Sequence, residues 1–219
     1  MVRGEFRLNK SVLSNKKARV SALFLSAKRF IMAGIMALIK TCPWWMGYSI
    51  DNPLRRMIHR PEKMLAPYLK PGMTAMDLGA GFGMFTIAMA ELVGPTGKVI
   101  AVDLQEKMLA EMKRRAKKQG VIDRIQPVLC KPDDLLIKDQ VGFVLTMWML
   151  HEVREPKKFL NQLKDCLKPE SRFLIVEPKY HVSQDQFQKI LALAEQVGLK
   201  KIETPKIRIS MAALLGLAA

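Results

Sequence analysis

The residues best suited to chemistry follow one short apolar run. Residues 75–83 read Ala-Met-Asp-Leu-Gly-Ala-Gly-Phe-Gly, with three glycines at alternate positions and Asp77 two residues before the first. Glycine suits a chain that leaves a strand, turns tightly and enters a helix while its backbone touches a ligand, because a Cβ would collide there. Gly79, Gly81 and Gly83 therefore predict a site for a nucleotide-like ligand.

The spacing of these glycines separates two kinds of ligand. A dinucleotide-binding turn has the spacing G-x-G-x-x-G and holds a pyrophosphate at the N-terminus of the next helix. Here the third glycine comes one residue early, and Met84 stands where that fingerprint has glycine. Asp77 adds a negative charge that would repel a pyrophosphate. The turn instead suits a ligand with a cationic amino group.

A second acid follows at the expected distance. Residues 98–104 read Lys-Val-Ile-Ala-Val-Asp-Leu, which predicts a buried strand ending at Asp103 and Leu104, about twenty residues beyond the glycines. An acid in this position can bind ribose hydroxyls. Two acids at two strand ends thus bracket one predicted ligand.

The surrounding pattern predicts the elements that position these residues. Strand-like apolar runs occur at 74–79, 98–104, 124–130, 141–150 and 171–178, and helical periodicity occurs at 61–70, 83–93, 105–119, 154–167 and 184–197. Because the two alternate, we expect a parallel sheet covered on both faces, with ligands at the carboxyl ends of the strands. Beyond Gly198, alternation across Pro205 predicts a closing antiparallel hairpin.

The acid, the glycine triplet, the second acid and the alternating elements resemble the class I S-adenosylmethionine-dependent methyltransferases. The first motif of that family is D-x-G-x-G-x-G, and its second strand ends in the ribose-binding acid. The resemblance covers residues 60–215 and implies an α/β fold, a doubly wound, seven-stranded, mostly parallel Rossmann-like sheet with helices on both faces. It also implies S-adenosylmethionine as the cofactor.

Short markers place the chain nearest to one branch of that family. Leu150-His151-Glu152-Val153, Leu167-Lys168-Pro169 and Glu177-Pro178 are typical of the ubiquinone/menaquinone-biosynthesis and arsenite methyltransferases. Arsenite methyltransferases work through several cysteines, whereas Cys42, Cys130 and Cys166 lie far apart in this chain. The branch therefore implies a small-molecule acceptor other than arsenite, and the cysteine spacing predicts neither a disulfide framework nor a metal site.

The resemblance assigns a set of cofactor residues, with one departure. The set is Asp77, Gly79, Ala80, Gly81, Gly83, Asp103, Leu104, Asp133 and Asp134. After the third strand, relatives commonly have Gly-Asp-Ala, but this chain has Lys131 and then Pro132, which has no N–H to donate. Asp133 or Asp134 is expected to hold the adenine amino group, and a solvated acidic turn is the alternative.

The candidate chemistry of methyl transfer lies at the ends of the fourth and fifth strands. His151 follows the fourth, and His181 follows the fifth shortly after Glu177. Methyl transfer needs an oriented nucleophile and, where the acceptor loses a proton, a base. His151 is the candidate base, with a role in orienting its loop as the alternative, while a structural role is favoured for His181 and His59. Glu177 is either a structural acid or an acceptor contact.

The net charge of +16 lies mainly in the N-terminal part. Residues 1–60 contain twelve Lys and Arg against two acids, whereas residues 61–219 contain twenty-four against eighteen. We expect two parts: residues 1–58 as a basic and apolar helical extension, and residues 59–219 as the methyltransferase domain. The apolar run of about ten residues in the extension is too short to span a bilayer, which takes about twenty.

The extension has three interpretations. Residues 21–50 form a lid over the active site, or they make peripheral contact with a membrane, or they bind RNA. The last is disfavoured because the basic residues lie apart from the aromatic ones, so nucleic acid is an unlikely partner. Cysteine usage indicates a cytoplasmic setting. The alternative is a cytoplasmic protein associated with the membrane surface. The sequence does not indicate an oligomeric state.

The leading functional hypothesis is methyl transfer from S-adenosylmethionine to a small, apolar molecule. The first alternative is an RNA methyltransferase, which the missing Asn/Asp-Pro-Pro-Tyr/Phe signature after the fourth strand disfavours. The second alternative is a protein that binds S-adenosylmethionine without turnover. Loss of methylation on changing His151, with cofactor affinity unchanged, would favour catalysis.

Overall fold

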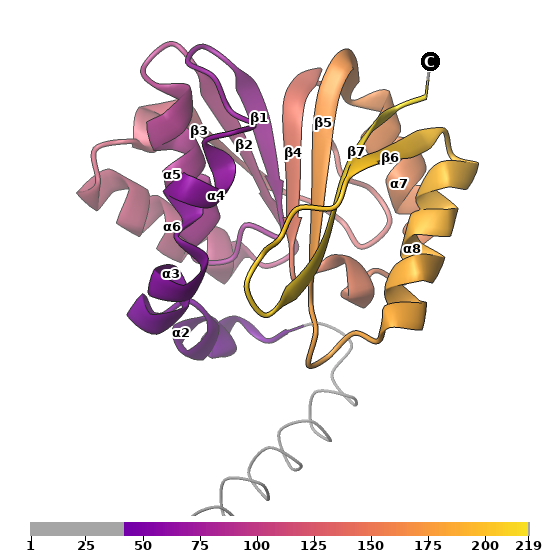
Figure 1. Ribbon diagram of the computed structural model, residues 1–219. Coiled ribbons are helices and arrows are strands. Elements are labelled where there is room, and N and C mark those ends of the chain that lie inside the picture. The colour runs from indigo at the N-terminus through magenta and orange to yellow at the C-terminus, as the bar shows by residue number, and fades with distance from the viewer. Residues whose placement is uncertain (1–41, 219) are drawn as a thin grey trace, which may run out of the picture. The chain divides into compact units, whose positions relative to one another are not determined.

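The computed structural model describes residues 42–218, and Trp44–Ala219 forms one compact unit (Figure 1). Residues 1–41, which carry most of the expected extension, lie outside the described part. Residues 44–58, which the sequence assigns to the extension, fold within the same compact unit as the domain. They form a short 3-10 helix, Trp44–Met46, and the helices α2 (Gly47–Ile50) and α3 (Pro53–His59).

The described chain contains one seven-stranded sheet with the order β3-β2-β1-β4-β5-β7-β6. Its strands are β1 (Thr74–Leu78), β2 (Lys98–Asp103), β3 (Ile125–Leu129), β4 (Val141–Met147), β5 (Leu167–Pro178), β6 (Leu199–Glu203) and β7 (Ser210–Leu217). The first five pair in parallel, and β7 runs antiparallel to both β5 and β6. The predicted doubly wound fold and its closing antiparallel hairpin are confirmed.

Helices cover the two faces of the sheet through separate apolar clusters. One cluster joins the sheet to α4 (Pro61–Leu65), α5 (Met84–Val93) and α6 (Glu106–Lys118). The other joins it to α7 (Pro156–Asp165) and α8 (Gln184–Gln196). Because the central strands are buried on both faces, their sequences are nearly continuous apolar runs rather than alternating ones.

Three element boundaries differ from the sequence prediction by three residues or more. Helix α4 ends at Leu65 rather than near residue 70, since Pro67 has no N–H to continue the helical hydrogen bonds. Strand β4 ends at Met147 rather than at residue 150, because Trp148 adopts a left-handed φ of 63°. Strand β5 begins earlier than expected, at Leu167, which pairs with Val141 before a register shift.

The carboxyl edge of the parallel strands gathers the segments that matter for function. At the bottom of Figure 1 lie α2, α3, the loop after β5 and the connection between β6 and β7. In an open α/β sheet, ligands bind at this edge where the strand order reverses. The reversal here falls between β1 and β4, which are neighbours in the sheet.

Candidate active site

The glycine turn between β1 and α5 is held by the neighbouring strand. The backbone N–H groups of Gly79 and Ala80 both donate to the Val102 carbonyl of β2, at 2.9 and 3.0 Å. Gly79, Gly81 and Gly83 have φ values of 77°, 54° and 88°, in the left-handed region that side chains rarely adopt. The alternate glycines therefore meet a backbone requirement of the turn.

Space around the three glycines differs. A Cβ on Gly79 would lie 2.9 Å from Met149 Cγ, and one on Gly83 would lie 2.5 Å from Met112 Cγ. For Gly81, among the described residues, the nearest atom to such a Cβ is the Gly79 carbonyl oxygen at 4.0 Å. Gly79 and Gly83 thus allow close packing within the protein, whereas the space beside Gly81 is open to a ligand.

Asp103 lies at the end of β2, beside this open space. Its Oδ2 accepts a hydrogen bond from the Gly81 N–H and its Oδ1 accepts one from the Gln105 N–H, both at 2.9 Å. Burial raises the pKa of Asp103, and these backbone hydrogen bonds oppose that shift. Each oxygen retains a lone pair after one bond, so the carboxylate can also accept two ribose hydroxyls.

Asp77 is enclosed beneath the turn. Its side chain is 2% exposed, and its Oδ2 accepts a hydrogen bond from Thr86 Oγ1 of α5 at 2.5 Å. Burial raises the pKa of Asp77 to about 7, a shift that Thr86 opposes and that the charge of Asp103 increases. A nearby cation favours the ionised form of such a carboxyl, so the site suits a ligand with a positive end.

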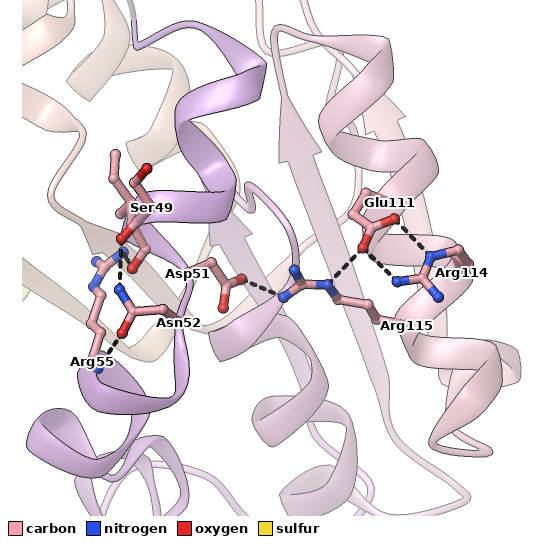
Figure 2. A network of polar contacts seen from close by, with 8 residues as sticks. Ser49, Asp51, Asn52, Arg55, Glu111, Arg114 and Arg115 are labelled. Carbon is pink, nitrogen blue, oxygen red and sulfur yellow. Dashed lines mark hydrogen bonds and ion pairs between the residues drawn. The ribbon is translucent and has the colours of Figure 1, made fainter.

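Residues 44–52 pack over the turn, and residues 44–50 belong to the segment for which a lid over the active site is one of the three interpretations. Tyr48 meets the buried Phe82 ring edge-on at 4.8 Å, and Gly47 lies against the same ring. Asp51 forms an ion pair with Arg115 of α6 at 3.1 Å (Figure 2). Burial raises the pKa of Asp51, and the charges of Arg115 and Arg55 and the backbone N–H of Met84, in the first turn of α5, oppose that shift.

The position of Asp51 bears on the choice of ligand. The N-terminus of a helix offers N–H groups and positive potential, which in dinucleotide sites hold a pyrophosphate. Here the Asp51 carboxylate lies near the first turn of α5, where the Met84 N–H lowers its pKa. The negative charge of Asp51 would repel a phosphate at this position, so the site fits an adenosyl ligand that has no phosphate.

The two acids expected at the adenine contact α7 or their own loop. Asp133 Oδ2 lies 3.7 Å from Lys158 Nζ, and Asp134 Oδ1 accepts the Leu136 N–H at 2.9 Å. Both line an open cavity of about 450 Å³ beside α7. Cys130 instead lies next to Asp103, whose carbonyl accepts its N–H at 3.0 Å. An adenine contact by Asp133 or Asp134 stays a prediction.

His151 and Glu177 form a pair that joins the ends of β4 and β5. His151 lies in the 3-10 helix Leu150–Glu152, and its Nδ1 makes a short hydrogen bond with Glu177 Oε2. Glu177 is fully buried, and its Oε1 accepts the Leu150 N–H at 2.9 Å. Since a carboxylate accepts hydrogen bonds, Nδ1 carries the proton and Nε2 carries the lone pair.

His181 lies against this pair. The rings of His151 and His181 meet edge-on with centroids 4.9 Å apart. Burial and the neighbouring His151 lower the pKa of His181, and Glu177 opposes that shift. A neutral His181 leaves His151 as the ring that the Glu177 carboxylate polarises, so the arrangement provides one oriented base at this edge of the sheet.

Trp148 forms an aromatic wall beside the same edge. Its left-handed backbone is held by a hydrogen bond from its N–H to the Val176 carbonyl, and its indole Nε1 donates to Ser210 Oγ. His59 and Tyr180 meet the ring edge-on, at 5.1 and 5.6 Å. A non-glycine residue in this conformation costs free energy, and such strain concentrates at functional sites. The wall suits an apolar, flat molecule.

The glycine turn with its two acids lies next to the residues that follow β4 and β5. Met149, between Trp148 and His151, packs against Gly79 of the turn. The expected cofactor residues at β1 and β2 and the expected base after β4 thus share one site. The residues that sequence reasoning did not assign to it are Asp51, Arg55, Thr86, Cys130 and the pairing role of Glu177, all set by contacts distant in sequence.

Comparison with known proteins identifies the family. The sequence model of a methyltransferase domain matches residues 69–209, which is more than half of the chain. The chain belongs to the class I S-adenosylmethionine-dependent methyltransferases. S-adenosylmethionine is the cofactor of this family, as the glycine turn and the two acids predict. Open space at Gly81 and free acceptor capacity on Asp103 fit that ligand.

One sequence relative supports the branch inferred from the short markers. The chain is 32% identical over 135 residues to the ubiquinone/menaquinone biosynthesis C-methyltransferase UbiE of Escherichia fergusonii. The match covers 59% of this chain and 54% of the relative. The chain therefore spans about half the length of the curated relatives it matches.

Solved structures of methyltransferases share the fold. A SAM dependent methyltransferase from Aquifex aeolicus superimposes with a TM-score of 0.74 at 24% identity, covering 81% of this chain and all of that one. A SAM-dependent O-methyltransferase from Thermotoga maritima gives a TM-score of 0.59 at 19% identity, covering 73% and 65%. At these identities the likeness concerns the fold.

Two further observations concern metals and membranes. Among the described residues, no group of three or more His, Cys, Asp or Glu side chains is arranged to hold a metal ion. Within the same residues, no helix has the length and apolar character needed to cross a bilayer. Most of residues 21–50, on which the prediction of peripheral membrane contact rests, lie outside the described part.

Proposed function

We propose that the protein transfers a methyl group from S-adenosylmethionine to a carbon atom of a small, apolar ring compound. The observation that carries the proposal is the hydrogen bond between His151 and Glu177, near Met149, which packs against the glycine turn; it supports His151 as an oriented base. The aromatic wall at Trp148 supports a flat acceptor. The relative named as a C-methyltransferase of quinone biosynthesis supports a ring carbon as the target.

The residues of the chain have separate tasks in this reaction. When bound, S-adenosylmethionine supplies an electrophilic methyl group on sulfur. Trp148 orients the ring of the acceptor, and His151 Nε2 takes the proton that the acceptor loses as the new carbon–carbon bond forms. Glu177 keeps His151 in the required tautomer and stabilises the imidazolium that results. Electrons balance because the carbon–sulfur bond electrons stay with the departing thioether.

The test uses the full chain with S-adenosylmethionine and a panel of hydroquinones and phenols with apolar substituents. We expect S-adenosylhomocysteine to form together with an acceptor heavier by one methylene unit, both detected by mass spectrometry. The His151→Gln variant should lose about 10²–10⁴-fold in turnover. Its affinity for S-adenosylhomocysteine, measured by calorimetry, should stay within about twofold. The expected cofactor residues at the ends of β1 and β2 form the cofactor half of the site, whereas His151, Glu177 and Trp148 form the acceptor half.

Two outcomes would contradict the proposal. Turnover by the His151→Gln variant at the wild-type rate would exclude His151 as the base. Methylation of an RNA transcript, with no methylation of any ring compound in the panel, would show that the acceptor is RNA rather than a small molecule. Binding of the cofactor with no turnover of RNA or of any panel compound would instead favour the binding protein without catalysis.

A further inference from the structure

Arg55 reaches the carboxyl edge of the sheet from α3. Asn52 caps this helix, since its Oδ1 accepts the Arg55 N–H at 3.0 Å, and Pro53 begins the first turn. Figure 2 shows Asn52 between Ser49 and Arg55, with Asp51 directed the other way, toward Arg115. The cap fixes where α3 starts and therefore where the Arg55 side chain leaves the backbone.

The Arg55 guanidinium lies between the two halves of the site. Its Cζ is 4.1 Å from the centroid of the Trp148 ring and 5.8 Å from that of Phe85. Phe85 belongs to the first turn of α5, after the glycine turn, and Trp148 follows β4. A guanidinium that stacks on an aromatic ring keeps its N–H groups in the plane of the fork, which is the geometry that binds a carboxylate.

The charge of Arg55 changes the pKa of residues in both halves of the site. Burial is the main influence on Asp77, and Arg55 is the cation that lowers the pKa of this carboxyl. The same charge lowers the pKa of His59 further than burial alone, and it opposes the rise that burial gives to Tyr180. Arg55 thus supplies positive potential beside the acid of the cofactor half.

The methionine end of S-adenosylmethionine is a zwitterion, with an ammonium and a carboxylate on one carbon. A site for it needs opposite charges on two sides. Asp77 supplies the negative side below the glycine turn, and Arg55 supplies the positive side from the α3 segment. The two come from segments 22 residues apart that the fold brings together.

We propose that Arg55 recognises the carboxylate of the methionine end of S-adenosylmethionine, so that α3 contributes a specificity residue to the cofactor site. The inference rests on the cofactor of the family and is independent of the proposed acceptor. An acceptor carboxylate has the same chemistry, and the test below separates the two sources.

The test compares two ligands by calorimetry, without an acceptor. Decarboxylated S-adenosylmethionine lacks only the carboxylate in question. We expect the wild-type chain to bind S-adenosylmethionine about tenfold to a hundredfold more tightly, as charge-assisted hydrogen bonds commonly contribute. In Arg55→Gln this preference should fall to about one, because the carboxylate loses its partner while the adenosyl contacts remain.

Two variants accompany it. Arg55→Lys keeps the charge and loses the planar fork, so it should retain part of the preference. Arg56→Gln is the matched control, since Arg56 is exposed and pairs with Glu62, and it should leave both affinities unchanged. Thermal unfolding of each variant checks the fold. If Arg55→Gln does not fold, the ratio of the two affinities is measured in Arg55→Lys instead.

Three results would overturn the inference. If Arg55→Gln retains the full preference, Arg55 does not bind the carboxylate of the cofactor. If the preference is retained and the KM of a carboxylate-bearing acceptor rises, Arg55 serves the acceptor. If both ligands weaken equally, Arg55 supports the fold only. The first and third results are read from binding affinities alone, so a failure of the proposed acceptor chemistry would leave them unaffected.

Discussion

The ends of β1 and β2 present a glycine turn and two carboxylates to the expected cofactor, whereas the ends of β4 and β5 present side chains to the proposed acceptor. The first group comes from residues 77–83 and from Asp103, which one strand pair holds together. The second combines His151, Glu177 and Trp148 with residues of α3. A backbone turn is a general device for a common cofactor, while side chains assembled by tertiary structure set the chemistry of one acceptor.

If the two halves are separate in function, changes in one should leave the task of the other intact. The largest effect is expected for Glu177→Gln, because an amide has one acceptor oxygen for two donors, the Leu150 N–H and His151 Nδ1, and carries no charge to stabilise the imidazolium. Turnover should fall about 10²–10³-fold. The affinity for S-adenosylhomocysteine should change by less than about twofold. A parallel loss of both quantities would show that the halves are not separate.

The glycine turn allows a test of whether packing against α6 requires glycine at Gly83. Gly83→Ala should lower the free energy of unfolding by about 2–4 kcal/mol, because a Cβ there meets Met112 at 2.5 Å in a left-handed backbone. Gly120→Ala is the matched control: Gly120 follows the end of α6 with a φ of 68°, and no described atom lies within 4 Å of its Cβ position. It should cost only about 1 kcal/mol. Urea unfolding of both variants measures the difference, and equal losses would rule out the packing explanation.

Asp103→Asn probes the cofactor half through binding. The amide keeps one acceptor oxygen but loses the charge, so the affinity for S-adenosylmethionine should fall about tenfold. Calorimetry measures the change, with NADH as a ligand that should not bind to either form. The maximal rate at saturating cofactor should stay near that of the wild type. A variant that binds normally but turns over slowly would assign Asp103 to the acceptor half.

The smallest net effect concerns pH, because the contributions of Asp77 and His59 to stability change in opposite directions with pH and largely cancel. The folded chain keeps the Asp77 proton up to about pH 7, while the unfolded chain loses it near the usual value of 3.8. This contribution to stability therefore fades as pH rises from about 4 to 7. Burial and Arg55 lower the pKa of His59 to about 4, so the unfolded chain takes up that proton first, near 6.5. The His59 contribution fades as pH falls over the same range.

Two variants separate these opposite slopes. Relative to the wild type, Asp77→Asn should become more stable as pH rises from about 4 to 7. His59→Gln should become relatively more stable as pH falls through about 6.5 to 4. Urea unfolding at several pH values checks both signs. Parallel curves for a variant and the wild type would mean that the group titrates normally in the folded chain.

Local sequence patterns predict the order of the elements and a set of cofactor residues at the glycine turn. Strands buried on both faces are continuous apolar runs, and a tight turn with left-handed φ values needs glycine, so both leave local signals at residues 75–83 and 98–104. The antiparallel hairpin after Gly198 was also predicted, although its second strand begins only at Ser210.

Tertiary structure alone decided the acceptor half and the cover of the glycine turn. His151 and Glu177 are separated by 26 residues. The sequence is equally consistent with a structural role for each, and only the neighbouring ends of β4 and β5 bring them into contact. Arg55 and Asp51 lie in a segment whose sequence indicated only an extension. Local patterns record backbone conformation and burial, whereas a contact between side chains from distant segments depends on strand order and packing, which no short window of sequence contains.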